Sequence, residues 1–207
     1  MDIAQARAWV EAIAAAVAEQ TDQLTQLDSA IGDGDHGANM RRGFAAVVAA
    51  LAILAPQTVG EVFVKTGNTL VSIVGGASGP LYGSAFRAIG KPLSAATVDG
   101  GQLLVGLRDG LAAIQRLGSA VPGDKTMVDA YAPAVAAFDR ELQRGGTVAD
   151  AAARAADAAE DGMRATRSLQ ARKGRASYLG ARSVGHQDPG ATSTALVFRA
   201  LATVTAT

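Results

Sequence analysis

Apolar residues recur at intervals of three and four along most of this chain, which is the period of an amphipathic α-helix. The first such stretch covers residues 2–27, and we predict that it forms one helix that delivers Asp28 at its end. The same period resumes over residues 37–54 and stops before Pro56, because proline cannot continue the hydrogen-bond ladder of a helix. A short polar loop therefore joins these two helices.

Helix-start signals divide the rest of the chain into further helices. Thr58, Asp99 and Thr147 are typical N-cap residues, and each precedes an apolar run. Pro133 lies inside one run, where we expect a kink. Because β-branched runs are few and no hairpin signal is present, we predict an all-α protein with about eight helices. The later predicted helices cover residues 58–74, 81–89, 99–118, 125–143, 147–168 and about 190–203.

Composition limits the domain organisation and the partners. With 207 residues, 49% of them hydrophobic and 18% charged, the chain can bury one substantial core and is not disordered. Neither a linker nor an internal repeat interrupts the helical pattern, so we predict a single domain over residues 1–207. The 19 basic and 19 acidic residues cancel, and charge therefore implies neither a nucleic-acid partner nor an anionic membrane.

Cysteine usage and the N-terminal residues bear on the cellular compartment. The chain has no cysteine, which excludes disulfides and thiolate chemistry. Acidic residues stand at Asp2 and Glu11 without a long apolar run after them, so we predict no signal peptide. No stretch reaches the length of a membrane span. We therefore expect a cytoplasmic protein.

The loop after the first helix carries the densest group of chemically active residues. Asp28, Asp33 and Asp35 supply the carboxylate oxygens that Mg²⁺ prefers, and the glycines between them let the backbone turn so that the oxygens converge. Residues His36 to Asn39 would then open a helix whose free N–H groups favour an anion at the same point. The loop therefore indicates a metal and phosphate site.

Two other interpretations apply to this loop. Asp and Gly are common turn formers, so an ordinary polar turn remains open for the motif taken alone. A calcium-binding EF-hand is excluded by spacing, because position twelve counted from Asp33 is Phe44 and not the required glutamate.

Two glycine-containing loops add candidate anion contacts. Residues 75–80, Gly-Gly-Ala-Ser-Gly-Pro, suit a phosphate near a helix N-terminus, although a plain helix connection explains them equally well. Residues 118–126 differ from a P-loop by one inserted residue, and the segment before them reads as helix rather than strand, so we reject a P-loop. We expect Asp124 to cap a helix and Met127 to offer an apolar contact to a base.

The last polar segments give one more candidate. The planar guanidinium of Arg175 suits phosphate oxygens, whereas a solvated basic loop is the simpler interpretation for Lys173. His186 is one of only two histidines, and we leave it out of the site because a lone histidine is more often structural.

These motifs together carry a resemblance to a known family. In order along the chain stand Asp28, Gly-Asp-Gly-Asp-His-Gly at 32–37, Gly-Gly-Ala-Ser-Gly-Pro-Leu-Tyr-Gly at 75–83, Gly-Asp-Lys-Thr-Met at 123–127, and Gly174-Arg175-Ala176 followed by Asp188-Pro189-Gly190. The sequence resembles the nucleotide-binding L subunits of dihydroxyacetone kinases from its first helix to its last. The resemblance implies an antiparallel barrel of about eight amphipathic helices that holds ADP or ATP and two Mg²⁺ ions at one end.

The resemblance also implies the roles of individual residues. The metal ligands would be Asp28, Asp33 and Asp35. No residue of this chain is assigned a covalent catalytic role, because catalysis would consist of positioning and charge neutralisation. The nucleotide would be bound by His36, Gly37, Ala38, Asn39, Ala77, Ser78, Gly118, Met127, Arg175, Asp188, Pro189 and Gly190.

The implied function is that of half an enzyme. The chain would carry the nucleotide and pass its terminal phosphoryl group to dihydroxyacetone held on a separate K subunit. A phosphotransferase-system protein, the M subunit, would rephosphorylate the bound ADP. Two alternatives stay open: an ATP-dependent kinase subunit for another small ketose, and a regulatory module that binds a nucleotide without transferring phosphate.

Overall fold

The computed structural model describes residues 1–206, and this part of the chain is helical without a β-strand. The all-α prediction is therefore confirmed. The α-helices are α1 Ile3–Glu19, α2 Thr21–Ile31, α3 His36–Ala52, α4 Val59–Ile73, α5 Ser78–Gly90, α6 Gly100–Gly118, α7 Val128–Gln143, α8 Val148–Ala165 and α9 Pro189–Thr205, with 3₁₀ segments η1 Thr166–Ser168 and η2 Arg175–Ser183.

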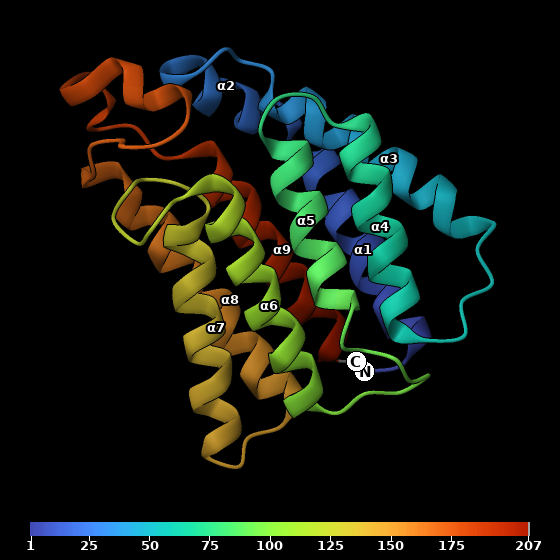
Figure 1. Ribbon diagram of the computed structural model, residues 1–207. Helices are drawn as coiled ribbons and strands as arrows, with labels where there is room; N and C mark the ends of the chain where they lie inside the picture. The colour runs from blue at the N-terminus through green and yellow to red at the C-terminus, as the bar shows by residue number, and fades with distance from the viewer. Residues whose placement is uncertain (207) are drawn as a thin grey trace.

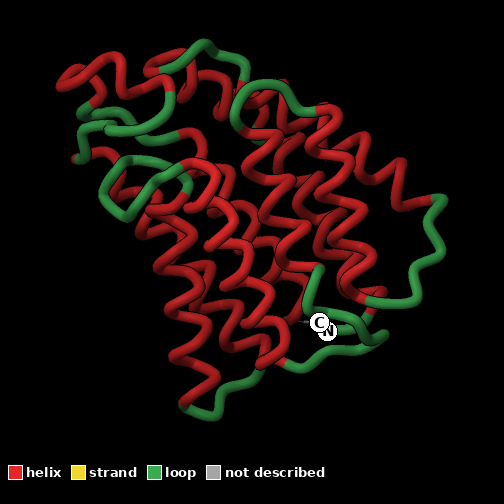
Figure 2. Tube along the Cα trace, viewed as in Figure 1, coloured by secondary structure: helices red, strands yellow, loops and turns green. Residues whose placement is uncertain are grey.

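The helices close into a barrel. Helix α1 packs against α3, each later helix packs against the next, and α9 returns to α1 (Figure 1). Figure 2 shows that the loops lie at the two ends of this ring, so neighbouring helices run antiparallel. Helix α2 and the η2 segment lie outside the ring at one end. The predicted antiparallel barrel of about eight helices is confirmed. None of the described helices combines the length and apolar character needed to cross a bilayer.

The first predicted helix is in fact two helices. Gln20 leaves the helical path, and α2 starts at Thr21, whose hydroxyl donates to the carbonyl of Val17 at 2.9 Å and to that of Ala18 at 3.0 Å. A threonine hydroxyl bonded to earlier carbonyls commonly bends a helix. The prediction of one helix over 2–27 was therefore wrong, and Asp28 lies inside α2 on its buried side rather than after the helix end.

The start of α7 also differs from the prediction. The helix begins at Val128 and not at Lys125, whose φ of 61° is left-handed. Asp124 does not cap it, because one of its carboxylate oxygens accepts a hydrogen bond from the Val121 N–H at 2.9 Å. The carboxylate of Asp129, within the first turn, accepts from the backbone N–H of Thr126 at 2.7 Å. The N-caps predicted at Thr58, Asp99 and Thr147 are confirmed.

Aromatic side chains fill the barrel and fix α1 against its neighbours. The Trp9 ring meets Phe63 edge-on with centroids 5.3 Å apart, and Phe44 meets Phe86 in the same way at 6.1 Å. The buried Trp9 indole N–H donates to the carbonyl of Val197 at 2.9 Å. This bond satisfies the one polar atom of the ring and joins α1 to α9, the helices that close the barrel.

Contacts between α4 and α5 depend on glycines that face each other. A Cβ atom on Gly60 would lie 2.2 Å from the Gly90 carbonyl oxygen, and one on Gly67 would lie 2.5 Å from that of Gly83. These separations allow no side chain, so the two backbones touch directly. The close contact holds the α4–α5 connection, residues 74–77, at the end of the barrel where α2 lies.

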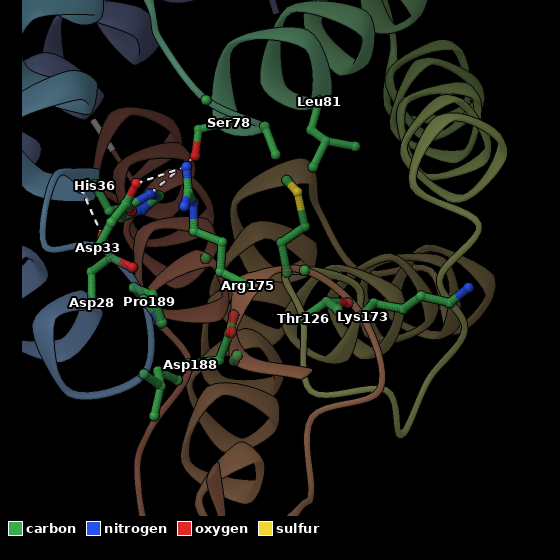
Figure 3. A pocket seen from close by; sticks show the side chains of 18 of the residues that line it. Asp28, Asp33, His36, Ser78, Leu81, Thr126, Lys173, Arg175, Asp188 and Pro189 are labelled. Atoms are coloured by element: carbon green, nitrogen blue, oxygen red, sulfur yellow. Dashed lines mark hydrogen bonds and ion pairs between the residues drawn. The ribbon is translucent and has the colours of Figure 1, made fainter. Parts of the chain in front are cut away.

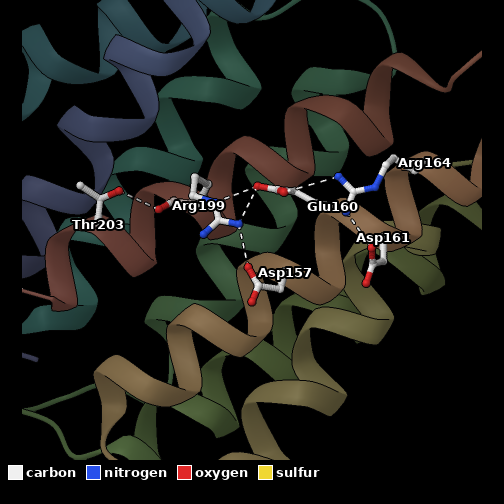
Figure 4. Close-up of polar contacts among 6 residues, drawn as sticks. All are labelled: Asp157, Glu160, Asp161, Arg164, Arg199 and Thr203. Atoms are coloured by element: carbon white, nitrogen blue, oxygen red, sulfur yellow. Dashed lines mark hydrogen bonds and ion pairs between the residues drawn. The ribbon is translucent and has the colours of Figure 1, made fainter.

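An ion-pair network joins α8 to α9 on the outer surface (Figure 4). Arg199 of α9 reaches Glu160 at 2.7 Å and Asp157 at 2.9 Å, while Arg164 pairs with Asp161 at 2.7 Å within α8. The side chains are largely exposed, so solvent and salt screen these pairs and each stabilises the fold only weakly.

Candidate functional site

Four helices begin at the end of the barrel that carries α2, and a cleft opens among their N-termini (Figure 3). The cleft lies where the starts of α3, α5, α7 and α9 converge on the loop between α2 and α3. It is lined by Asp28, Ile31, Gly32, Asp33, Asp35, His36, Gly75, Gly76, Ala77, Ser78, Leu81, Tyr82, Lys125, Thr126, Met127, Lys173, Gly174, Arg175, Ala176, Asp188, Pro189 and Gly190.

The two ends of the barrel differ in how the helix N-termini are satisfied. At the far end, the helices α1, α4, α6 and α8 are capped by the side chains of Asp2, Thr58, Asp99 and Thr147. At the cleft end, α9 is capped by Asp188, whereas the backbone N–H groups of α3, α5 and α7 donate no hydrogen bond to the side chain of the N-cap residue. Backbone N–H groups without such caps bind anions and carry the positive end of the helix dipole.

Three carboxylates meet beside these helix starts. Asp28, Asp33 and Asp35 each offer an oxygen, and these three oxygens lie within 4.8 Å of one another. Asp28 is buried, and its Oδ2 atom accepts from the backbone N–H groups of Asp35 at 2.9 Å and His36 at 3.1 Å. A Cβ atom on Gly32 would lie 2.1 Å from Asp28 Oδ1, so only glycine fits there. This set of oxygens, fixed on one side and exposed on the other, fits Mg²⁺ ions that share their remaining ligands with phosphates.

Arg175 brings the opposite charge to the carboxylates. Its Nη2 atom lies 2.9 Å from Asp33 Oδ2, and both side chains remain substantially exposed. Arg175 follows Gly174, whose φ of 66° turns the chain toward the cleft at the start of η2. An exposed pair of this kind is weak, so the guanidinium is free to exchange a carboxylate for a phosphate oxygen.

A buried hydrogen-bond chain joins the starts of three helices around His36. The imidazole Nδ1 lies 3.1 Å from Ser78 Oγ of α5, and Nε2 lies 2.9 Å from Ser193 Oγ of α9. Ser193 in turn lies 2.7 Å from the Tyr82 hydroxyl. Burial lowers the pKa of His36, although Asp28 and Asp35 act in the opposite sense. The neutral imidazole is therefore favoured, and it fixes α3, α5 and α9 relative to one another.

Asp188 caps α9 from a fully enclosed position. Its carboxylate accepts from the Ala191 N–H at 2.7 Å, and its own backbone N–H donates to Thr166 Oγ1 at 3.0 Å. Burial raises the pKa of the Asp188 carboxyl to about 7, although the Ala191 hydrogen bond and the Lys125 charge lower it. The start of α9 at Pro189 and Gly190 is thus held at the cleft by a carboxyl group that titrates near neutrality.

Most of the predicted site residues line this cleft, and four do not. The predicted residues that line it are Asp28, Asp33, Asp35, His36, Ala77, Ser78, Met127, Arg175, Asp188, Pro189 and Gly190. Gly37 packs against the Thr21 carbonyl, Asn39 accepts from Arg42 at 2.7 Å, and Gly118 ends α6 near Leu81. Ala38 also lies outside the lining. The metal and nucleotide contacts of all the predicted residues, those in the lining and these four, stay predictions.

Sequence reasoning missed several residues of the cleft. Tyr82 lines the cleft, and its hydrogen-bond partner Ser193, just behind the lining, lies 111 positions away along the chain, so no local pattern joins them. Lys125 was compared with a P-loop lysine and set aside, and Lys173 was expected in solvent, yet both line the cleft. The sequence signal that could have identified Lys125 as a cleft residue was its place in the run 123–127, two positions before the predicted base contact Met127.

Comparisons with known proteins agree with this geometry. Residues 30–203 match the DAK2 domain. The chain is 43% identical to the ADP-binding subunit DhaL of the PEP-dependent dihydroxyacetone kinase of Escherichia coli K12, over 94% of this chain and 93% of that protein. It is 45% identical to the ADP-binding subunit DhaL of the PTS-dependent dihydroxyacetone kinase of Lactococcus lactis, over 96% and 95% of the two chains.

A solved structure shares the fold. The dihydroxyacetone kinase from C. freundii in complex with AMP-PNP and Mg²⁺ superposes on 97% of this chain with a TM-score of 0.75 and 28% identity. The match covers 34% of that longer protein.

The pKa of Asp188 leads to a prediction about stability. Because the folded state holds this proton up to about pH 7, and the unfolded state loses it near 3.8, the stabilisation is lost as the pH rises through 7. We expect the free energy of unfolding to fall by about 2–3 kcal/mol between pH 5 and 8 relative to Asp188→Asn, which keeps the capping oxygen. Urea unfolding without nucleotide measures this difference. If the free energies of unfolding of the wild type and of Asp188→Asn changed with pH in parallel, the prediction would be wrong.

Proposed function

Because the chain belongs to the DAK2 domain family, we propose that it is the nucleotide-binding subunit of a dihydroxyacetone kinase. In this role it binds ADP or ATP with two Mg²⁺ ions and transfers the terminal phosphoryl group to dihydroxyacetone on a separate K subunit. Relatives of similar length are named as ADP-binding subunits of such kinases. We assign residues 1–207 to a single domain of this type.

One observation carries the proposal. The three converging carboxylates lie at the end of the barrel where α3, α5 and α7 begin without a hydrogen bond to the side chain of their own N-cap residue. Carboxylates bind cations and free helix N-termini bind anions, so the two features together suit a metal-bound polyphosphate. A metal site alone would not need the uncapped helix starts.

The residues divide the binding between them. Asp28, Asp33 and Asp35 would hold two Mg²⁺ ions, which when bound neutralise the charge of the transferring phosphoryl group. The N-termini of α3 and α5 would accept the phosphates, and the guanidinium of Arg175 would contact the transferring group. The base and ribose would lie toward Met127 and the start of α9. This chain thus orients the nucleotide and forms no covalent bond to it.

The acceptor and the phosphoryl donor lie outside this chain in the proposal. The match covers 34% of the C. freundii kinase chain, which leaves a further part of that kinase to present dihydroxyacetone. The relatives of similar length are named as subunits, which supports placing that part on a separate subunit here. The relatives named as PEP- and PTS-dependent support a phosphotransferase-system protein, an M subunit, that rephosphorylates bound ADP. We propose that the protein, like these partners, is cytoplasmic. Free exchange of ATP and transfer to another small ketose is the alternative within the same class.

The first test identifies the nucleotide and the donor. A desalted sample of the protein is denatured, and the released nucleotide is identified and quantified. The protein is then mixed with a K-type subunit and dihydroxyacetone, with either ATP or a phosphotransferase-system donor. We expect stoichiometric ADP and product formation with the phosphotransferase-system donor. If ATP alone drives turnover, the in-place rephosphorylation is wrong, and if neither donor does, a regulatory module replaces the kinase subunit.

Asp35→Asn tests the metal site. The substitution removes one of three like charges, so the protein without ligand should be as stable as before or slightly more stable. Mg²⁺-dependent ADP binding should be lost. Thermal unfolding with and without Mg-ADP reports both effects, and Asp109→Asn on the exposed face of α6 is the matched control. A full ligand-induced rise in Tm for Asp35→Asn would show that this carboxylate binds no metal.

Arg175→Lys tests the phosphate contact. Lysine keeps the charge but lacks the planar fork that pairs with phosphate oxygens. We expect kcat with the K-type subunit to fall at least about tenfold, while ADP binding changes little. Arg182→Lys, in the same η2 segment, serves as the control and should leave kcat unchanged. Equal kcat values for both variants would place Arg175 in a solvated loop without a role in transfer.

A further inference from the structure

Lys125 occupies an unusual place in the loop between α6 and α7. Its side chain is 1% exposed, although lysine is rarely buried, and its φ of 61° is rare for a residue other than glycine. Its ammonium group donates to the Thr166 carbonyl at 2.6 Å and also to the His186 carbonyl. Thr166 lies in η1, and His186 lies just before α9. One ammonium group therefore joins three chain connections.

Other hydrogen bonds reinforce this junction. The Asp124 carbonyl accepts from the Arg172 N–H at 3.0 Å, and the Thr166 hydroxyl accepts from the Asp188 N–H at 3.0 Å. The Arg167 carbonyl accepts from the Gly185 N–H at 2.8 Å. The three connections thus touch one another at several points, but the Lys125 ammonium is the one group that bonds to both of the others.

Each connection carries part of the cleft wall. Met127 follows Lys125 by two positions, Pro189 and Gly190 follow His186, and the segment after Thr166 leads to Arg175. Figure 3 shows Thr126 across the cleft from Asp28 and Asp33. The wall opposite the carboxylates is therefore assembled from segments that meet at Lys125.

The buried charge of Lys125 indicates that this position serves more than packing. Burial lowers the pKa of its ammonium, whereas Asp188 and Asp129 raise it. A buried ammonium is costly, and an apolar side chain of equal volume often stabilises a fold as well or better. Backbone strain and buried charge at one position commonly mark a functional constraint. The ammonium group holds the three connections in fixed positions through its hydrogen bonds. An apolar side chain could not do so.

We propose that Lys125 is a positioning residue that holds these three connections together around the bound nucleotide and so sets the rate of nucleotide release. The proposal rests on nucleotide binding in this cleft, as argued above. We expect the nucleotide to leave when the three connections separate from one another and the wall opposite the carboxylates opens. That separation breaks the hydrogen bonds from the Lys125 ammonium to the Thr166 and His186 carbonyls.

The test compares nucleotide release from the full chain and its variants. Lys125→Met keeps the unbranched stem and removes the ammonium, and Lys91→Met, on an exposed residue after α5, is the control. Each protein is loaded with a fluorescent ADP analogue in Mg²⁺ and chased with excess ADP. We expect release from Lys125→Met to be at least about tenfold faster and still dependent on Mg²⁺, because the carboxylates are unchanged. Lys91→Met should release at the wild-type rate.

Three results would overturn the proposal, and they differ in what they imply. A wild-type protein that binds no nucleotide overturns the proposed function as well. A wild-type protein that binds, with Lys125→Met releasing at the same rate, overturns the positioning role alone. If the ligand-free variant has a lower Tm but releases the nucleotide at the wild-type rate, Lys125 has only a structural role. This result also overturns the proposal.

A second variant covers the case in which Lys125→Met does not fold. Thr166→Val removes the hydroxyl that accepts from the Asp188 N–H and leaves the Thr166 carbonyl in place. It loosens the same junction from a residue that does not itself line the cleft. We expect release about threefold to tenfold faster than in the wild type, and an unchanged rate would count against the junction.

Discussion

An antiparallel ring of eight helices necessarily places four helix N-termini at each of its ends, and this constraint shapes the molecule. The far end satisfies its N-termini internally, with capping side chains at Asp2, Thr58, Asp99 and Thr147. The cleft end leaves three helices without such caps and brings three carboxylates to them. The three helices without a hydrogen bond to their own N-cap side chain are locally less stable, because such a cap typically contributes about 1 kcal/mol. It creates a place where cations and anions are both favoured.

The cleft has two walls that are held by opposite chemistry. On one wall the Asp28 carboxylate accepts from backbone N–H groups of the loop that leads into α3. On the other wall the Lys125 ammonium donates to backbone carbonyls of two connections. Each charge is buried, and each is satisfied by backbone rather than by a side chain of opposite sign. The two walls are held by separate buried charges, and the Arg175–Asp33 ion pair and the His36–Ser193 hydrogen bond join one wall to the other.

Much of the fold follows from the sequence, and so does the carboxylate wall of the cleft. The opposite wall, which contains Lys125, does not. The helical period and the caps at Asp99 and Thr147 predict the elements because both signals are local. The break at Thr21 was not predicted because the apolar spacing continues through it. The start of α7 was placed wrongly because Asp129, and not Asp124, accepts hydrogen bonds from the preceding N–H groups. Lys125 could not be recognised as buried, because its partners lie 41 and 61 positions away.

In the proposed function, the charges of the cleft would couple the binding of metal and nucleotide. Asp33 pairs with Arg175, and Asp28 and Asp35 lie close to it. A cation that binds these carboxylates weakens the hold of Asp33 on the guanidinium, and the freed guanidinium then favours an incoming phosphate. A phosphate in turn adds oxygen ligands for the cation. Each ligand would therefore raise the affinity for the other, and linkage makes the effect reciprocal; Arg175 would provide one route for this coupling, and the shared phosphate oxygens the other.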